Sequence, residues 1–245
     1  MQRIMIQTRD GQCPGYVYRP AGHGPWPAVL VYMDALAIRP AMLEIGERLS
    51  ANGYFTLLPD LFYRSGPYAP MDPKKIFSDP EQRKILMEKF MAPATAANVM
   101  SDTAAFLEFI AAQPDVRPGP IGTTGYCMGG LLSLTAAGTY PERIAAAASY
   151  HGGRLASDAP DSPHLLAGKI KARVYVAGAS EDASFPDDMK ARLEQALTEA
   201  GVDHTIETYP AKHGWVFRDT PVFDAPAAER HWQSLLALLE ATLKR

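Results

Sequence analysis

Apolar runs alternate with helix-like patterns along most of the chain. Residues 28–33 (AVLVYM) form an unbroken apolar run, which is typical of a strand covered on both faces. Met42, Ile45 and Leu49 follow at the three- to four-residue spacing of an amphipathic helix. The next apolar run, residues 54–60, indicates a second buried strand. This strand–helix–strand order is the one that builds a parallel sheet.

The same alternation extends to the C-terminus. At the start of the chain, an Asp10-Gly11 pair between two strand-like segments predicts a hairpin. The pattern as a whole predicts an α/β protein with a doubly wound, mostly parallel sheet and helices on both faces. Neither an internal repeat nor a linker interrupts it, so we expect a single domain over residues 1–245. The later strands are predicted at residues 119–126, 144–152, 172–182 and 203–210, and the later helices at residues 101–113 (with Ser101 as N-cap), 128–140, 186–201 and from about residue 227 onward.

Residues 61–95 break this alternation. They begin with a loop rich in proline and glycine, and residues 79–91 (DPEQRKILMEKFM) then have the pattern of an amphipathic helix. An insertion that follows a strand in this kind of sheet is expected to form a lid or a pocket wall.

Composition narrows the class of protein. Hydrophobic residues make up 47% of the chain and charged residues 21%, as in ordinary soluble globular proteins. The formal net charge of -3 and the lack of a basic run predict no nucleic-acid partner. No segment approaches the roughly 18 apolar residues of a membrane span, and the N-terminus lacks the pattern of a signal peptide. We therefore expect a cytoplasmic protein that does not bind membranes, either a monomer or a homodimer.

Cys127 lies at the most suggestive point of the chain. The segment GYCMG places it between a predicted strand and a predicted helix, with Gly125 and Gly129 two residues away on each side. This is the pattern of a nucleophile elbow, in which small residues allow a sharp turn and close packing. The helix N-terminus would favour a thiolate, and the Met128 amide could stabilise an oxyanion. The alternative is a buried thiol at a turn whose glycines serve packing alone.

An acid and a histidine follow in the order expected for α/β-hydrolases. Asp182 lies at the end of the strand predicted at residues 172–182, and His213 comes after the strand predicted at residues 203–210. His151 also follows a strand, but it precedes every acidic candidate and therefore fits that order poorly. The other acidic candidates are Glu181, Asp187 and Asp188, which are interpreted as a loop neighbour and the start of a helix.

The quoted segments resemble the dienelactone hydrolase family, which includes the carboxymethylenebutenolidases. GYCMGG is similar to the family's elbow, PDLFYRSG to its strand-end loop, and GASEDASFP and HGWVF to its acid and histidine segments. The resemblance implies a Cys127–His213–Asp182 triad, with Ala35 as the second oxyanion donor. It also implies that Asp34 takes the place of a family glutamate that helps to activate the thiol, although Asp34 is one methylene shorter. A cap for the following loop is the alternative role of Asp34.

The family binds a substrate carboxylate through two arginines, one on the lid helix and one after the histidine. The resemblance therefore makes Arg83 and Arg218 candidates for substrate binding, although a charged residue on a lid helix is more often simply solvated. Tyr126, His151 and Trp215 are further candidates for the pocket.

These observations predict a cysteine-dependent hydrolase of a lactone or a small activated ester, acting through a thioester. No metal site or cofactor is expected, because no metal-binding or dinucleotide-binding motif occurs. One alternative is a broad-specificity aryl or phosphoryl esterase with the same triad. A non-catalytic protein that binds a small ligand is another, and a redox pair of Cys127 with Cys13 is a third.

Overall fold

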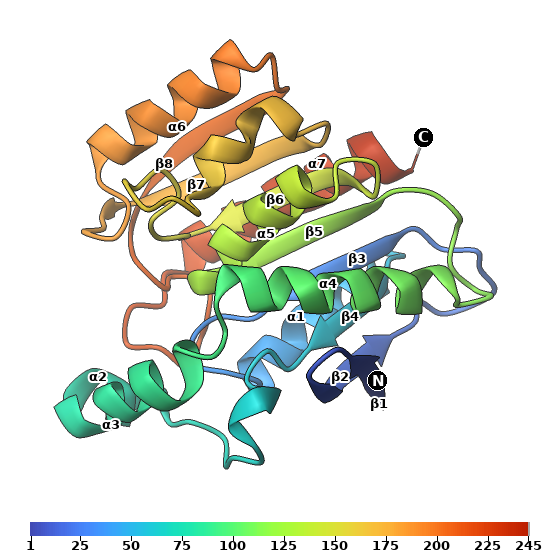
Figure 1. Ribbon diagram of the computed structural model, residues 1–245, viewed down its shortest axis with the longest axis horizontal. Coiled ribbons are helices and arrows are strands. Elements are labelled where there is room, and N and C mark those ends of the chain that lie inside the picture. The colour runs from blue at the N-terminus through green and yellow to red at the C-terminus, as the bar shows by residue number, and fades with distance from the viewer. Residues whose placement is uncertain (245) are drawn as a thin grey trace.

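An eight-stranded sheet runs through the computed structural model, which describes residues 1–244 (Figure 1). The strand order is β1-β2-β4-β3-β5-β6-β7-β8. The strands are β1 (Gln2–Thr8), β2 (Gly11–Tyr18), β3 (Ala28–Tyr32), β4 (Phe55–Pro59), β5 (Ile121–Tyr126), β6 (Ile144–Tyr150), β7 (Arg173–Glu181) and β8 (His204–Lys212). The α-helices are α1 (Pro40–Ala51), α2 (Pro73–Ser78), α3 (Pro80–Ile85), α4 (Ala96–Ala111), α5 (Met128–Thr139), α6 (Asp187–Glu199) and α7 (Ala225–Leu243). The 3-10 helices are η1 (Tyr63–Ser65) and η3 (Pro163–Lys169), and η2 (Leu86–Met91) is a π-helix.

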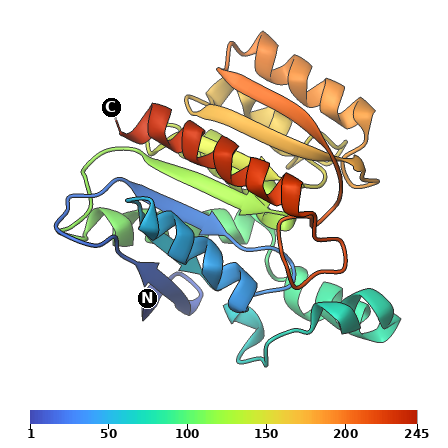
Figure 2. The same ribbon diagram turned by 180° about the vertical axis from the view of Figure 1, so that it is seen from behind.

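The sheet confirms the predicted α/β class. β1 and β2 form the antiparallel hairpin expected around Asp10-Gly11, and β2 also pairs antiparallel with β4. All the remaining pairs are parallel. Helices α4, α5 and α6 cover one face, and α1 and α7 cover the other, as Figure 2 shows from behind. β3, β4 and β5 are buried throughout, which explains why none of them contains a charged residue.

Helix α4 begins earlier than the sequence indicated. Ser101 was expected to cap it, but the helix begins at Ala96, and the side chain of Thr95 accepts a hydrogen bond from the Asn98 amide. Val99 and Met100 are buried in the added turns, so the burial of apolar side chains, together with this cap, extends the helix.

The insertion at residues 61–95 contains the helix predicted at residues 79–91, since α3 and η2 follow one another without a break over residues 80–91, and the short helix α2 precedes it. Asp79 ends α2 and caps α3, because its side chain accepts hydrogen bonds from the amides of Glu81 and Gln82. α2 and α3 project beyond the sheet at the lower left of Figure 1. The last residues of the insertion precede α4, and three of them, Met91, Ala94 and Thr95, line the cavity described below.

The topology brings four strand ends to one edge. β3, β5, β7 and β8 run parallel, so the residues that follow them lie along the same side of the sheet. Among the helices of residues 1–244, none combines the length and the apolar character needed to span a membrane.

Candidate active site

Cys127 occupies a strained turn between β5 and α5. Its backbone has φ 54° and ψ -118°, outside the regions that residues other than glycine normally adopt. A β-carbon on Gly125 would lie 1.8 Å from the Gly129 carbonyl oxygen, and one on Gly129 would lie 2.2 Å from the carbonyl oxygen of Tyr32. Glycine is therefore required at both positions, because backbone atoms cannot move aside for a side chain.

The amides around the turn are engaged unequally. The Cys127 amide donates to the Tyr150 carbonyl (3.2 Å) and to Nδ1 of His151 (3.1 Å). Within residues 1–244, neither the Met128 amide nor the Ala35 amide has a hydrogen-bond acceptor. Both amides are therefore free to bind an oxygen atom of a substrate.

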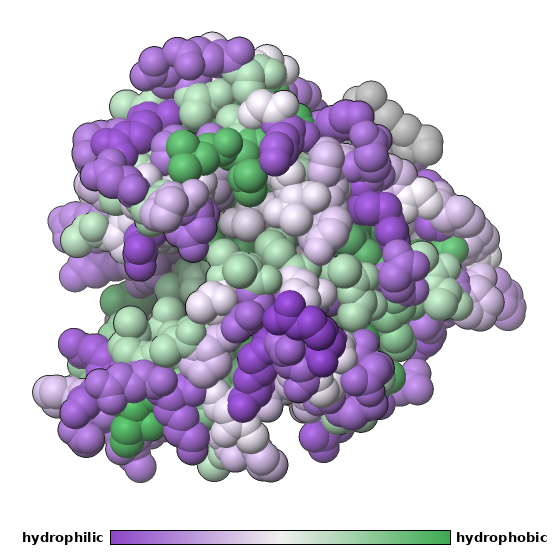
Figure 3. Space-filling view, viewed as in Figure 1, coloured by the Kyte–Doolittle hydropathy of each residue, from purple (hydrophilic) through white to green (hydrophobic). Residues whose placement is uncertain are grey.

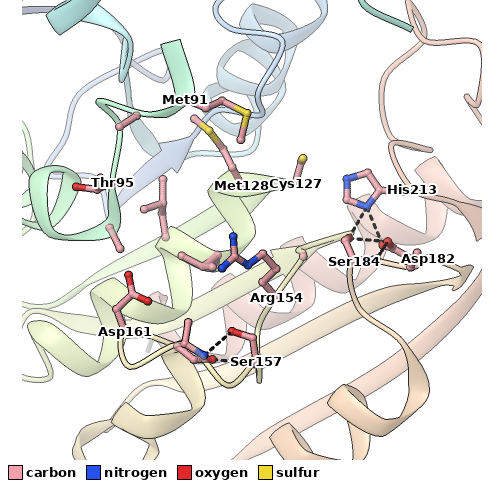
Figure 4. A pocket seen from close by; sticks show the side chains of 18 of the residues that line it. Met91, Thr95, Cys127, Met128, Arg154, Ser157, Asp161, Asp182, Ser184 and His213 are labelled. Carbon is pink, nitrogen blue, oxygen red and sulfur yellow. Dashed lines mark hydrogen bonds and ion pairs between the residues drawn. The ribbon is translucent and has the colours of Figure 1, made fainter. Parts of the chain in front are cut away.

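Asp182 and His213 form a hydrogen-bonded pair. Nδ1 of His213 lies 2.7 Å from Oδ2 of Asp182, whose side chain is only 4% exposed. The other carboxylate oxygen of Asp182 accepts hydrogen bonds from the Ser184 hydroxyl (2.6 Å) and the Ser184 amide (2.9 Å). The second ring nitrogen of His213 is on the side of the ring that faces Cys127 (Figure 4).

Electrostatics favour a charged pair at this position. Burial lowers the pKa of His213, but hydrogen bonds to Asp182 and Cys127 outweigh it and raise the pKa to about 10. For Asp182 burial raises the pKa, and the hydrogen bonds from His213 and Ser184 outweigh it, so that the pKa is lowered. His213 is therefore protonated at neutral pH beside an ionised Asp182.

The three side chains border a cavity of about 620 Å³. Figure 3 shows the hollow at the left of the molecule, with apolar surface around it and polar surface beyond. Figure 4 shows Met91 and Met128 on one side of the cavity and Ser157 and Asp161 on another. The lining residues are Met91, Ala94, Thr95, Ala96, Cys127, Met128, Leu131, Leu132, Gly153, Arg154, Ser157, Ala159, Asp161, Ser162, Glu181, Asp182, Ala183, Ser184 and His213. A small, largely apolar molecule fits this cavity.

Asp34 is bound to Arg39. Nη1 and Nη2 of Arg39 lie 2.7 and 3.0 Å from the two carboxylate oxygens of Asp34, and the Leu36 amide donates to one of them. Among the described residues, no hydrogen bond joins Asp34 to Cys127. The implied role of Asp34 in activating the thiol has no support in this arrangement, whereas its bond to the Leu36 amide matches the alternative role of a loop cap.

The two arginines implied by the family lie elsewhere. The Arg83 side chain donates to the Phe77 carbonyl on the insertion, and neither Arg83 nor Arg218 lines the cavity. Arg218 lies in a separate groove beside α1 and α7, 6.0 Å from the ring centre of Phe223. The expectation that Arg83 and Arg218 bind substrate is therefore corrected, because neither residue lines the cavity that holds Cys127.

Arg154 is the cavity residue that the sequence interpretation missed. Its guanidinium lies in the cavity (Figure 4) and makes no hydrogen bond or ion pair within residues 1–244. Its backbone has φ 59°, and its amide donates to the Ser184 carbonyl at 2.6 Å. The signal in the sequence was its position just after β6, in the segment HGGR.

Three further candidates lie behind the elbow instead of lining the cavity. Tyr126 is fully buried, and its hydroxyl pairs with Nε2 of His231. Trp215 and His151 are also buried and pack edge to face at 4.9 Å between ring centres. The expectation that Tyr126, His151 and Trp215 contact the substrate is therefore corrected, because buried side chains outside the cavity cannot reach a ligand in it.

No metal centre is formed by the described part of the chain: residues 1–244 hold no group of three or more His, Cys, Asp or Glu side chains arranged to bind a metal ion.

A strained cysteine elbow, an Asp–His pair and a doubly wound sheet together define an enzyme of the α/β-hydrolase fold. The chain belongs to the dienelactone hydrolase family, whose sequence pattern matches residues 13–243. It is accordingly a hydrolase of carboxylic esters. A Synechocystis protein provisionally named carboxymethylenebutenolidase is 27% identical over 98% of this chain and 96% of its own length. A carboxymethylenebutenolidase of Pseudomonas putida is 31% identical over 61% of this chain and 60% of that protein.

Solved structures have the same fold. A Klebsiella pneumoniae protein provisionally identified as a dienelactone hydrolase superposes with a TM-score of 0.84 at 24% identity and covers 97% of both chains. P91, a dienelactone hydrolase-like promiscuous phosphotriesterase from metagenomic libraries, superposes with a TM-score of 0.76 at 23% identity and covers 98% of both chains.

Proposed function

We propose that this protein hydrolyses a lactone or a small activated ester with Cys127 as nucleophile, through a thioester intermediate. The observation that carries the proposal is the convergence of Cys127, His213 and Asp182 on one cavity, with His213 bound to Asp182 at 2.7 Å. A nucleophile, a base and a group that orients the base are the parts that such catalysis requires.

The first half of the reaction forms the thioester. The Cys127 thiolate attacks the substrate carbonyl carbon, and the negative charge moves to the carbonyl oxygen. The Met128 and Ala35 amides would bind this oxygen, and the loss of one such donor raises the activation barrier by about 2.7–4 kcal/mol. As the intermediate collapses, the carbon–oxygen bond breaks, and Nε2 of protonated His213 gives its proton to the departing oxygen.

The second half restores the enzyme. Neutral His213 removes a proton from water, and the resulting hydroxide attacks the thioester carbon. The carbon–sulfur bond then breaks, which releases the carboxylic acid and the Cys127 thiolate beside protonated His213. Asp182 keeps Nδ1 of His213 protonated throughout and thereby leaves Nε2 as the nitrogen that exchanges protons.

The nucleophile and the cavity together restrict the substrate. A thiolate is a better leaving group than an alkoxide, so an adduct with an unactivated ester tends to revert to the starting materials. Enol lactones and aryl esters have stabilised leaving groups and suit a cysteine enzyme better. The apolar side of the cavity, which includes Met91, Met128 and Leu132, suits the apolar part of a substrate. The unpaired guanidinium of Arg154 suits a carboxylate or another polar substituent.

The test compares hydrolysis of p-nitrophenyl acetate and an unsaturated enol lactone by the wild type, by Cys127→Ala and by Cys13→Ala. Cys13 is a buried thiol of the N-terminal hairpin and serves as the matched control. We expect Cys127→Ala to lose activity by orders of magnitude and Cys13→Ala to keep it. Equal activity of wild type and Cys127→Ala would refute the proposed nucleophile, and an aryl phosphotriester in the same assay tests the broader esterase alternative.

A further inference from the structure

His151 belongs to no part of the mechanism above, yet it contacts the Cys127 backbone and the His213 ring. The Cys127 amide donates to two acceptors, and Nδ1 of His151 is the nearer at 3.1 Å, with the Tyr150 carbonyl at 3.2 Å. The His151 ring packs edge to face against the His213 ring, with 5.1 Å between centres and planes at 61°. The His151 amide donates to the Ala177 carbonyl of β7, which anchors the residue to the neighbouring strand.

The backbone at His151 is arranged to make this contact. The residue has φ 40°, a left-handed conformation that a side chain other than glycine adopts only at a cost. The turn reverses the chain directly after β6 and brings the imidazole back over the end of β5, where Cys127 begins α5.

The surroundings of the His151 ring fix its protonation state. Burial, followed by the nearby positive charges of His213 and Arg39, holds the pKa of His151 far below its usual range, so the ring is neutral. Because Nδ1 accepts a hydrogen bond, the single proton of the neutral ring is on Nε2. Within residues 1–244, this buried Nε2 has no hydrogen-bond partner. The ring thus leaves one polar group unsatisfied, while its Nδ1 binds the Cys127 amide.

We infer that His151 is a positioning residue of the proposed reaction: its neutral Nδ1 holds the Cys127 backbone, and its ring edge supports His213, so that one side chain sets the placement of the nucleophile relative to the base. The inference rests on the proposed function for its catalytic consequence. Sub-ångström placement matters here, since a displacement of about 1 Å can cost about 100-fold in rate.

Two amide variants separate this role from mere packing. In His151→Asn the side-chain oxygen stands near the place of Nδ1, and asparagine tolerates a left-handed backbone. In His151→Gln the oxygen reaches instead toward the place of Nε2, where the native ring has no partner. The two side chains are both amides and differ only in the position of the acceptor oxygen. Thermal unfolding of each variant protein establishes that it is folded.

Two readouts are needed for each variant. The first is the rate of Cys127 alkylation by iodoacetamide from pH 5 to pH 10, with Cys127→Ala as the blank. The second is kcat and KM for p-nitrophenyl acetate. We expect His151→Asn to keep the wild-type alkylation profile and most of kcat. For His151→Gln we expect alkylation at neutral pH to slow and kcat to fall by about 10- to 100-fold, with KM little changed.

The alkylation readout keeps the inference separate from the proposed function. If His151→Gln changes the alkylation profile and His151→Asn does not, His151 positions Cys127 even if the wild type hydrolyses no ester. If both folded variants behave like the wild type, or if both are impaired equally, the position of the acceptor does not matter and the inference is overturned.

Discussion

Arg39 binds Asp34 through two hydrogen bonds, and the same guanidinium binds Asp219 in the loop that follows β8. Nε of Arg39 lies 2.6 Å from Oδ2 of Asp219. Arg39 is 3% exposed and Asp34 is 4% exposed, so the pair is buried. The bridge links the loop that carries Ala35 to the loop that carries His213, although Arg39 and Asp219 are 180 residues apart in sequence. Arg39 therefore joins the oxyanion loop to the histidine loop.

Breaking this bridge from one side should destabilise the fold. Arg39→Met leaves the Asp34 carboxylate buried and unpaired, which costs about 3–5 kcal/mol in comparable pairs. Urea unfolding measures the loss. The double variant Asp34→Leu/Arg39→Met removes both buried charges and should recover most of the stability. A double variant that is less stable than Arg39→Met alone would contradict this explanation.

Gly129 should tolerate no side chain. A β-carbon there would lie 2.2 Å from the Tyr32 carbonyl oxygen and 2.6 Å from that of Met33. We expect Gly129→Ala to lower the free energy of unfolding by about 1–3 kcal/mol or more and to abolish esterase activity, because α5 must move away from β3. Gly168→Ala is the matched control, since nothing lies within 4 Å of its β-carbon. Equal stability of the two variants would count against close packing at the elbow.

The His213–Asp182 pair predicts a pH dependence of stability. The pKa of His213 is about 10 in the folded protein, and the ordinary value is 6.5. Because the pKa of His213 is higher in the folded than in the unfolded state, protonated His213 stabilises the fold fully below pH 6.5. This stabilisation is lost as the pH rises toward 10. The difference in unfolding free energy between wild type and His213→Gln should therefore shrink over this range. A difference that grows with pH would contradict the assigned shift.

Asp182→Asn should impair catalysis without removing the nucleophile. The variant loses the carboxylate that holds the Nδ1 proton of His213, and general acid–base catalysis of this kind contributes about 10²–10⁴-fold. We expect kcat for p-nitrophenyl acetate to fall within this range while KM changes little. An unchanged kcat would mean that another group orients His213.

Arg154 should determine preference among substrates. We expect Arg154→Met to raise KM for an aryl ester with a free carboxylate by about tenfold, since a hydrogen bond to a charged group contributes about 1.5 kcal/mol. KM for p-nitrophenyl acetate, which is neutral, should stay the same. Asp161 and Glu181 also border the cavity, and removing either carboxylate should lower KM for the aryl ester that has a free carboxylate. Arg83→Met is the control, because Arg83 lies on the insertion outside the cavity.

Much of the architecture could be predicted from local sequence patterns. Parallel strands end at one edge of a sheet, so the order of Cys127, Asp182 and His213 along the chain already implied that they lie together. The glycines around Cys127 likewise pointed to the sharp turn, because no other residue fits beside the carbonyls of Tyr32 and Gly129.

Contacts between distant side chains could not be predicted in the same way. The Asp34–Arg39–Asp219 bridge depends on which loop faces which, and nothing in the segment YMDAL indicates an arginine partner. Arg83 and Arg154 illustrate the same limit. A residue's place in the chain does not show whether its side chain bends toward its own helix or into the cavity.

The most direct test of the central claim is the intact mass of the protein during turnover of p-nitrophenyl acetate, quenched in acid and followed by peptide mapping. The predicted result is an acetyl group on Cys127. It should be absent from Cys127→Ala, and it should accumulate in His213→Gln, which is impaired in the activation of water. The thioester mechanism would be contradicted by steady turnover by the wild type with no acetyl group on Cys127 in the wild type or in His213→Gln. An acetyl group on another residue would contradict it as well.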